Sequence, residues 1–230
     1  MTVPLFSLAL ALACALLAAP PAAAQPRETP LTASTISGPS EIILKGGSWV
    51  PVKLRDTIAE GDGARALAGG RLTLLTHNGN SIRLAQLTQM FIFEPPSGPA
   101  GGPTPVGAPL KVKLDGGRIW VSVLPLSVTR APIEVEAGPA TVGVRSGGIS
   151  LRTNSDGGVL VRCYHGLGVV RATSGPAWER PLKTGEELLV PLSGAPPATR
   201  PLTSDPEELN WVKWNTDQDI VAYGMPAPPK

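Results

Sequence analysis

Glycine and proline divide this chain into short apolar runs over most of its length. The 230 residues include 26 Gly and 26 Pro, which stand between short runs of Val, Ile and Leu. Such punctuation is typical of many short strands joined by turns. Aromatic residues make up only 4% of the chain, so aliphatic side chains must fill most of the core. The pattern predicts an all-β protein.

Several of these runs alternate between apolar and polar residues, as half-buried strands do. Between Leu110 and Leu114, Lys111 and Lys113 alternate with apolar residues, so one face is buried and the other is wet. In the run 159–165, one face holds Val159, Val161 and Cys163, and the other holds Leu160, Arg162 and Tyr164.

Turn residues separate the predicted strands. A glycine pair begins four of these strands. Two of the pairs follow Asp115 and Asp156, and Asp followed by Gly is typical of hairpin turns. Asn78-Gly79 indicates a further hairpin. The spacing of the pairs is irregular, so the sequence shows no solenoid of constant repeat length. A rolled or solenoid-like, antiparallel-rich stack of strands is the fold that we expect.

The first 24 residues have the pattern of a secretory signal peptide. An apolar stretch too short to span a bilayer is followed by a proline break and small residues, with cleavage expected between Ala24 and Gln25. Acylation at Cys14 is a less favoured alternative, because the apolar run continues past this cysteine. The mature chain contains no second apolar segment that could span a membrane, so we expect a periplasmic or secreted protein.

The remaining chain divides by composition. We expect a flexible leader at 25–39, a β domain at 40–192, a linker at 193–204 and a helical segment at 205–223, followed by a disordered tail at 224–230. Within the β domain, residues 95–109 contain six Pro and four Gly and form an inserted loop.

The helical segment begins with a recognisable start signal. Asp205, Pro206 and Glu208 match an N-cap, a first-turn proline and a capping-box partner for a short helix. Leu209 and Val212 would lie on its inner side. Trp211 and Trp214 would form an aromatic ridge, which packs on the domain or, as the less favoured alternative, docks a partner.

Charge and cysteine content exclude several classes of function. The net charge is only +2, and the cations are scattered among acids, which argues against nucleic acid as a partner. Cys163 is the single cysteine of the mature chain, so no internal disulfide can form. Its thiol is either a small core residue or, if it is exposed beside His165, a reactive group.

The order of several degenerate motifs resembles the FecR domain family. The resemblance covers about residues 45–192. The first half matches through Gly61-Asp62 and Asn78-Gly79-Asn80-Ser81. The second half matches through strands that begin near Leu114, Pro132 and Asp156, including Ile119-Trp120-Val121 and Val142-Gly143-Val144-Arg145.

This resemblance implies an all-β domain that is used for binding in the bacterial envelope. The sequence lacks the anti-sigma segment and transmembrane helix of the signalling members, so regulation of a sigma factor is not implied. We expect a protein or cell-wall component as the partner, and a role in envelope sensing. A passive structural envelope protein and a periplasmic enzyme are the alternatives.

No catalytic, cofactor or metal constellation is visible in the sequence. Only His77 and His165 could serve as a histidine base, and no nucleophile motif accompanies either. Cys163 and His165 lack a second pair of metal ligands. We therefore expect a protein that is not an enzyme and has no cofactor. Arg145, Arg162 and Tyr164 are the candidate partner-binding residues, because they are polar or amphipathic groups on otherwise apolar strands.

Overall fold

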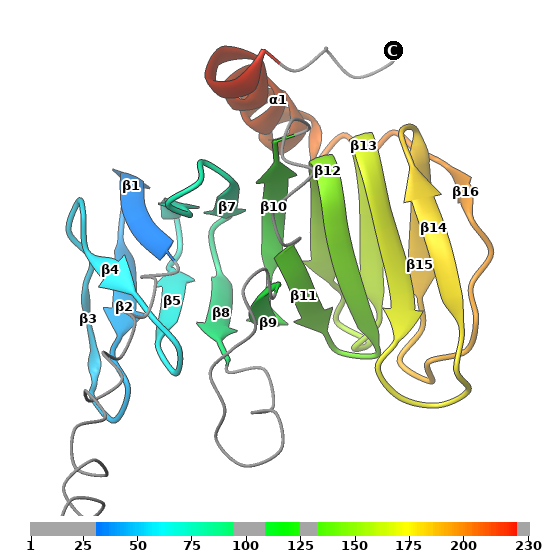
Figure 1. The fold of residues 1–230 in the computed structure, drawn as a ribbon, viewed down its shortest axis with the longest axis horizontal. Helices are drawn as coiled ribbons and strands as arrows, with labels where there is room; N and C mark the ends of the chain where they lie inside the picture. Colours follow the sequence, from blue (N-terminus) through cyan, green and yellow to red (C-terminus); the bar gives the residue numbers. More distant parts are fainter. Residues whose placement is uncertain (1–30, 94–108, 125–132, 225–230) are drawn as a thin grey trace, which may run out of the picture.

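The computed structural model describes residues 31–93, 109–124 and 133–224, and these residues form one sheet that curls on itself (Figure 1). One helix, α1 (Leu209–Tyr223), follows the strands. The strands are β1 (Leu31–Ser37), β2 (Ser40–Ile43), β3 (Trp49–Pro51), β4 (Thr57–Ile58), β5 (Gly63–Ala66), β6 (Arg71–Leu75), β7 (Ser81–Leu84), β8 (Thr88–Ile92), β9 (Leu110–Gly116), β10 (Arg118–Val123), β11 (Ile133–Ala137), β12 (Ala140–Thr153), β13 (Val159–Ala172), β14 (Glu179–Lys183), β15 (Glu186–Val190) and β16 (Arg200–Pro201). The prediction of an all-β, rolled and antiparallel-rich sheet with a short C-terminal helix is confirmed.

Two long strands, β12 and β13, divide the sheet into two halves. Residues 140–144 of β12 pair with β11, whereas residues 147–152 pair with β10. In β13, residues 159–163 pair with β15 and residues 167–171 with β14. The β11 half also contains β3, β2, β5, β8, β9 and β14, and the β10 half also contains β4, β1, β6, β7, β15 and β16. Among the described strands, only β9 and β11 pair in parallel.

The long hairpin bends where Gly147 of β12 faces Gly166 of β13. Both residues have positive φ, +81° and +96°. A Cβ on Gly147 would lie 2.1 Å from the carbonyl oxygen of His165, and one on Gly166 would lie 2.1 Å from that of Ser146. Only glycine fits this bend, which lets both strands pass from one half into the other.

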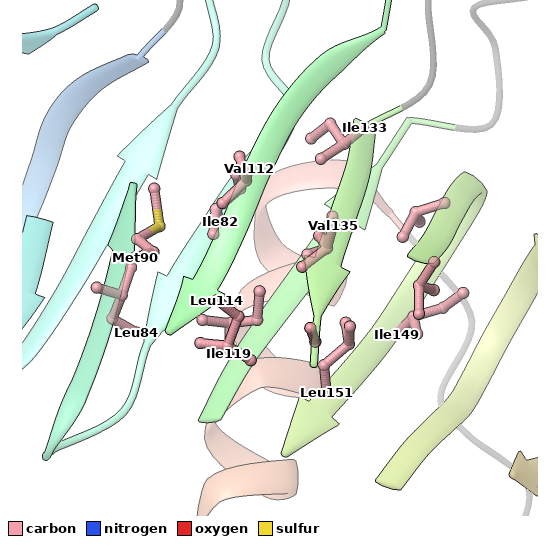
Figure 2. Close-up of a cluster of buried hydrophobic side chains, with 14 of the residues drawn as sticks. Ile82, Leu84, Met90, Val112, Leu114, Ile119, Ile133, Val135, Ile149 and Leu151 are labelled. Carbon is pink, nitrogen blue, oxygen red and sulfur yellow. The ribbon is translucent and has the colours of Figure 1, made fainter. Parts of the chain in front are cut away.

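The two halves enclose one aliphatic core. Alternate residues of the strands point inward, as in β9, where Val112 and Leu114 are buried while Lys113 is exposed. Figure 2 shows side chains of both halves meeting in this core, among them Ile119 of β10 and Val135 of β11. Burial of this apolar surface is the main favourable contribution to folding.

Two predicted boundaries are wrong. Residues 31–37, which we expected in the flexible leader, form β1. This strand pairs with β6 and β4, and its residues Leu31 and Ala33 are buried. Within the expected linker, Arg200 and Pro201 form β16 and pair with β15. In both cases a short strand is specified by its neighbours in the sheet rather than by its own composition. The expected tail, apart from Gly224, and residues 95–108 of the inserted loop lie outside the described residues.

The turn signals have mixed outcomes. Asn78-Gly79 and Asp156-Gly157 lie in hairpins, between β6 and β7 and between β12 and β13. The hairpin expected after Asp115 is wrong, because β9 and β10 do not pair. The chain instead crosses at Gly117 from the β11 half to the β10 half. A Cβ on Gly117 would lie 2.5 Å from the carbonyl oxygen of Leu87, so this crossing requires close backbone approach.

The helix α1 lies against the β10 half, beside β10 and β12 (Figure 1). It begins after a turn at 205–208 and ends at Gly224, whose N–H donates to the carbonyl oxygen of Ile220. Leu209, expected on the inner side, is 58% exposed, whereas Trp211 is buried and packs on the sheet. Glu208 makes no side-chain cap. No helix in the described part of the chain is long and apolar enough to cross a membrane.

Candidate functional site

The outer face of the β10 half, which is turned away from the core, carries polar side chains that are nevertheless buried. Strand register places five of them in one row together with Trp120; the five are Thr73, Arg83, Ser150, Arg162 and Glu187. Polar groups on an outer strand face ordinarily meet water, and burying them unpaired is costly. Contacts from α1 and from the segment 203–208 cover this row and satisfy its charges.

The first set of contacts converges on Asp219 of α1, which is fully buried. Its Oδ1 accepts hydrogen bonds from Arg83 Nη1 at 2.6 Å and Ser122 Oγ at 2.7 Å. Its Oδ2 accepts one from Trp120 Nε1 at 2.9 Å, and His165 Nε2 lies 3.2 Å away without hydrogen-bond geometry. We call these five residues the Asp219 cluster. It joins α1 to β7, β10 and β13.

The second set of contacts converges on Glu208, immediately before α1. Its Oε1 lies 2.8 Å from Arg152 Nη1 and 3.1 Å from Arg118 Nη1, and its Oε2 accepts a short hydrogen bond from Arg162. Asp205 adds an ion pair with Arg152 at 3.1 Å. We call Glu208 and its three arginines the Glu208 cluster. It fixes the start of α1 over β10, β12 and β13.

Arg162 links the Glu208 cluster to Glu187 of β15. Its Nε donates to Glu187 Oε2 at 2.9 Å, and Arg200 and Thr203 also donate to the same carboxylate. Burial alone would raise the pKa of Glu187, but the hydrogen bonds from Thr203 and Arg162 outweigh it and lower the pKa. Burial likewise opposes charge on Arg162, yet the surrounding carboxylates raise its pKa. Both groups stay ionised.

A bulge places His165 in the Asp219 cluster. Strict alternation would put it on the same face as Cys163, as the sequence predicts. The register of β12 and β13 shifts between Gly148 and Ile149, and His165 moves to the outer face above Gly148. Burial lowers the pKa of His165, and the nearby Asp219 offsets this only in part. The pairing of Cys163 and His165 on one face is therefore wrong.

Cys163 occupies the inner face, where it is fully buried in the aliphatic core. Burial raises the pKa of its thiol to about 12, so this thiol lacks the thiolate character that makes cysteines reactive. Of the two interpretations left open by the sequence, the structure supports the core residue. Within the described residues, no group of three or more His, Cys, Asp or Glu side chains could hold a metal ion.

The three candidate partner-binding residues lie in different surroundings. Arg145 is exposed at a register shift of β12, close to the bend. Arg162 is 4% exposed and Tyr164 is 8% exposed, and Tyr164 stacks on Trp120 at 4.9 Å. Burial raises the pKa of Tyr164 to about 12. Arg162 and Tyr164 thus contact other parts of this chain, and a partner could reach them only after α1 moves. Ala24 and Gln25 lie outside the described residues.

Sequence reasoning did not single out Arg83 or Asp219. It named Glu208 only as a capping-box partner and not as an ion-pair partner. A usable signal was present, because Arg83, Arg118, Arg152 and Arg162 all occupy outward positions of strands. Four outward cations on adjacent strands require acids from another element, and the C-terminal segment supplies Asp205, Glu208 and Asp219. The clusters are therefore an interface that docks α1.

A separate apolar cleft lies where the curled sheet is open, between β3 and β4. Its volume is about 460 Å³, and Ile42, Leu44, Val50 and Pro51 line it together with the polar residues Lys53, Asp56 and Thr57. Leu44 is 50% exposed and Val50 is 46% exposed. Strands β3 and β4 stand at the two ends of the strand order, so each has one edge without a partner among the described strands. The cleft thus combines apolar side chains with free strand edges.

Comparison with known proteins gives fold neighbours but no family. No family model matches this chain, and no curated protein matches it. Among similar solved structures, two are each described as a "putative anti-sigma factor" from Parabacteroides distasonis. The first has a TM-score of 0.49 and 15% identity, and covers 67% of this chain and 64% of that one. The second has a TM-score of 0.48 and 14% identity, and covers 71% of this chain and 75% of that one.

Proposed function

We propose that the mature chain is an exported, non-enzymatic, FecR-like binding module of the bacterial periplasm, and that it recognises an extended segment of an envelope protein. The observation that carries this proposal is the apolar cleft between the free edges of β3 and β4. The secretory leader and the order of FecR-like motifs support the location and the class of protein.

The geometry of the cleft favours a polypeptide over a polysaccharide of the cell wall. An unpaired strand edge offers backbone donors and acceptors to an extended peptide, and side-chain pockets then supply specificity. The exposed Leu44 and Val50 provide such an apolar surface, which loses contact with water when a partner binds. An open edge beside exposed aliphatic residues is otherwise a liability for aggregation, so coverage by a partner also protects the fold.

Site-specific photocrosslinking tests this proposal in the envelope. A photoreactive phenylalanine derivative replaces Val50 in the full-length chain, which is exported by its own leader. The matched control carries it at Val221, which is 84% exposed on α1 and far from the cleft in sequence. We expect one protein adduct from position 50 and none from position 221, with the crosslinked partner peptide identified by mass spectrometry.

The same experiment distinguishes the competing functions. Leu44→Asp should abolish the adduct at position 50 if apolar contact holds the partner. A persistent adduct, or adducts of equal yield from both positions, would contradict recognition at the cleft. Absence of any adduct would favour a passive structural role, and an adduct of two copies of this chain would show self-association instead.

Export itself has a separate test. Cleavage after Ala24 gives a mature chain that begins with Gln25, because small residues precede this bond. Intact-mass measurement of the protein from the periplasmic fraction should show this species. A chain that retains Met1, or one that begins with an acylated Cys14, would contradict simple cleavage.

A further inference from the structure

Three of the four edge strands in the described sheet carry a proline. The strands with a partner on one side only are β3, β4, β14 and β16. Pro51 lies in β3, Pro181 in β14 and Pro201 in β16, whereas β4 consists of Thr57 and Ile58. Proline lacks a backbone N–H, so it blocks the addition of a further strand where its nitrogen faces the free edge.

Hydrogen bonding shows that the nitrogen of Pro51 faces the free edge of β3. Along an antiparallel strand, the backbone groups of successive residues point alternately toward the partner strand and away from it. The N–H of Val52 donates to the carbonyl oxygen of Ser40 at 3.1 Å, so Val52 faces β2 and Pro51 faces outward. Within β3 this leaves Trp49 as the one residue with an N–H directed outward.

The other two prolines have the same orientation. Trp178, just before β14, faces β13 because its carbonyl oxygen accepts from Ala172, and the alternation then turns Pro181 outward. Leu202, just after β16, faces β15 because its N–H donates to a carbonyl oxygen of the turn before that strand, so Pro201 is turned outward. All three prolines therefore occupy positions at which they prevent edge-to-edge pairing.

The fourth edge strand, β4, is left open. The N–H of Ala33 in β1 donates to the carbonyl oxygen of Asp56 at 2.8 Å, which turns Asp56 toward β1 and Thr57 away from it. Thr57 thus directs a backbone N–H and C=O to the free edge. This residue is exposed and lines the apolar cleft, so an incoming segment can reach both groups.

We propose that the extended segment recognised at the cleft adds to the sheet as a strand paired with β4 at Thr57, rather than with β3. This inference rests on the proposed function and assigns the edge at which that binding occurs. Because Pro51 removes a donor from β3, this strand serves as an apolar wall of the cleft through Val50. Three edges closed by proline, and one left open beside an apolar cleft, indicate that β4 is the edge kept for a partner.

The size of β4 also defines the kind of segment that fits. A strand of two residues offers few backbone hydrogen bonds, so contact with the exposed Leu44 and Val50 must supply much of the affinity. Side chains of an extended segment alternate between the two faces of a sheet. A segment with apolar residues at alternate positions therefore fits, with those residues directed into the cleft.

Hydrogen exchange of the photocrosslinked adduct identifies the edge that pairs. The adduct formed at position 50 is compared with the same variant purified without its partner, by mass spectrometry of fragments that separate residues 49–51 from 56–58. We expect slower exchange of the Thr57 amide in the adduct and unchanged exchange of the Trp49 amide. Slower exchange at Trp49 would place the segment on β3, and an adduct with neither amide slowed would exclude strand addition. Both results would overturn the inference but leave recognition at the cleft intact, whereas the absence of any adduct would refute both.

A pair of substitutions at one position supplies the matched test. Thr57→Pro removes the outward N–H without breaking a bond to β1, and it should lower the adduct yield at position 50 about tenfold or more. Thr57→Val keeps this N–H and should give the yield of the original chain. Equal yields from the two variants would overturn the inference. If Thr57→Pro does not fold, as judged by circular dichroism, the exchange measurement decides alone.

Discussion

Asp219→Asn should release α1 from the sheet while the strands stay folded. The substitution keeps the size of the side chain but removes the charge that balances Arg83, whose side chain is only 3% exposed. The hydrogen bonds from Ser122 and Trp120 lose an ionised acceptor at the same time. Because the main aliphatic core contains no residue of α1, the loss should appear first as local opening of the helix.

The expected size of the effect follows from the burial of the pair. Removing one partner of a buried ion pair costs about 3–5 kcal/mol, since it leaves an uncompensated charge in a poorly solvated place. At about 1.4 kcal/mol for each factor of ten, the opening of α1 should become about a hundredfold to a few thousandfold more frequent. The Trp211 contacts and the Glu208 cluster still oppose complete release.

Hydrogen exchange of the α1 amides measures this opening. Asp217→Asn is the matched control, because Asp217 lies on the same helix but is exposed, and Lys213 is its one ion-pair partner among the described residues. Exposed pairs of this kind contribute about 0.3–0.5 kcal/mol, so exchange should change little. Replacing both partners, Arg83→Met with Asp219→Leu, should restore much of the protection. If Asp219→Asn exchanged like Asp217→Asn, the Asp219 cluster would not be what holds the helix.

Three further predictions concern β12 and β13. Cys163 should resist maleimide in the native protein, because burial raises its thiol pKa to about 12, and Cys163→Ala should cost about 1 kcal/mol in urea unfolding. Fast stoichiometric labelling of the folded protein would contradict its burial. Since burial lowers the pKa of His165, the unfolded chain takes up a proton first as the pH falls, and stability should decline below about pH 6.5. His165→Gln should remove that part of the decline, and an unchanged pH profile would refute the assignment. Gly147→Ala should cost about 3 kcal/mol, because the residue has positive φ and a close carbonyl. Gly143→Ala, whose Cβ would meet no atom closer than 3.8 Å, should cost less than about 1 kcal/mol, and equal losses would show that the bend tolerates a side chain.

Alternation and turn chemistry made the strand content of this chain predictable. A period of two depends only on local geometry, so it placed Val112, Leu114 and Cys163 correctly on inner faces. Asn78-Gly79 and Asp156-Gly157 were interpreted correctly because each turn joins strands that pair with each other. These signals act over a few residues and need no knowledge of the rest of the fold.

Local sequence patterns gave wrong predictions where residues distant in the sequence determine the structure. The glycine pair at 147–148 resembles a turn before a strand, yet it lies within β12 at the bend of the sheet. Its function depends on Gly166, almost twenty residues later, which faces it across the hairpin. Leu31 and Ala33 likewise belong to a strand because β6 and β4 pair with it.

Apolar periodicity predicted the docking of α1 only in part, because its buried stripe is mostly polar. Trp211, Asn215 and Asp219 recur every four residues and face the sheet, whereas Leu209 and Ile220 are more exposed. The apolar pattern placed Trp211 and Trp214 correctly on the packed side but misplaced Leu209, and it could not indicate Asn215 or Asp219. Charge is the better guide here: cations at outward strand positions need buried acids, and the C-terminal segment supplies them. Glu208 and Glu187 already neutralise Arg162, so this face of the sheet is fully occupied by contacts within the chain.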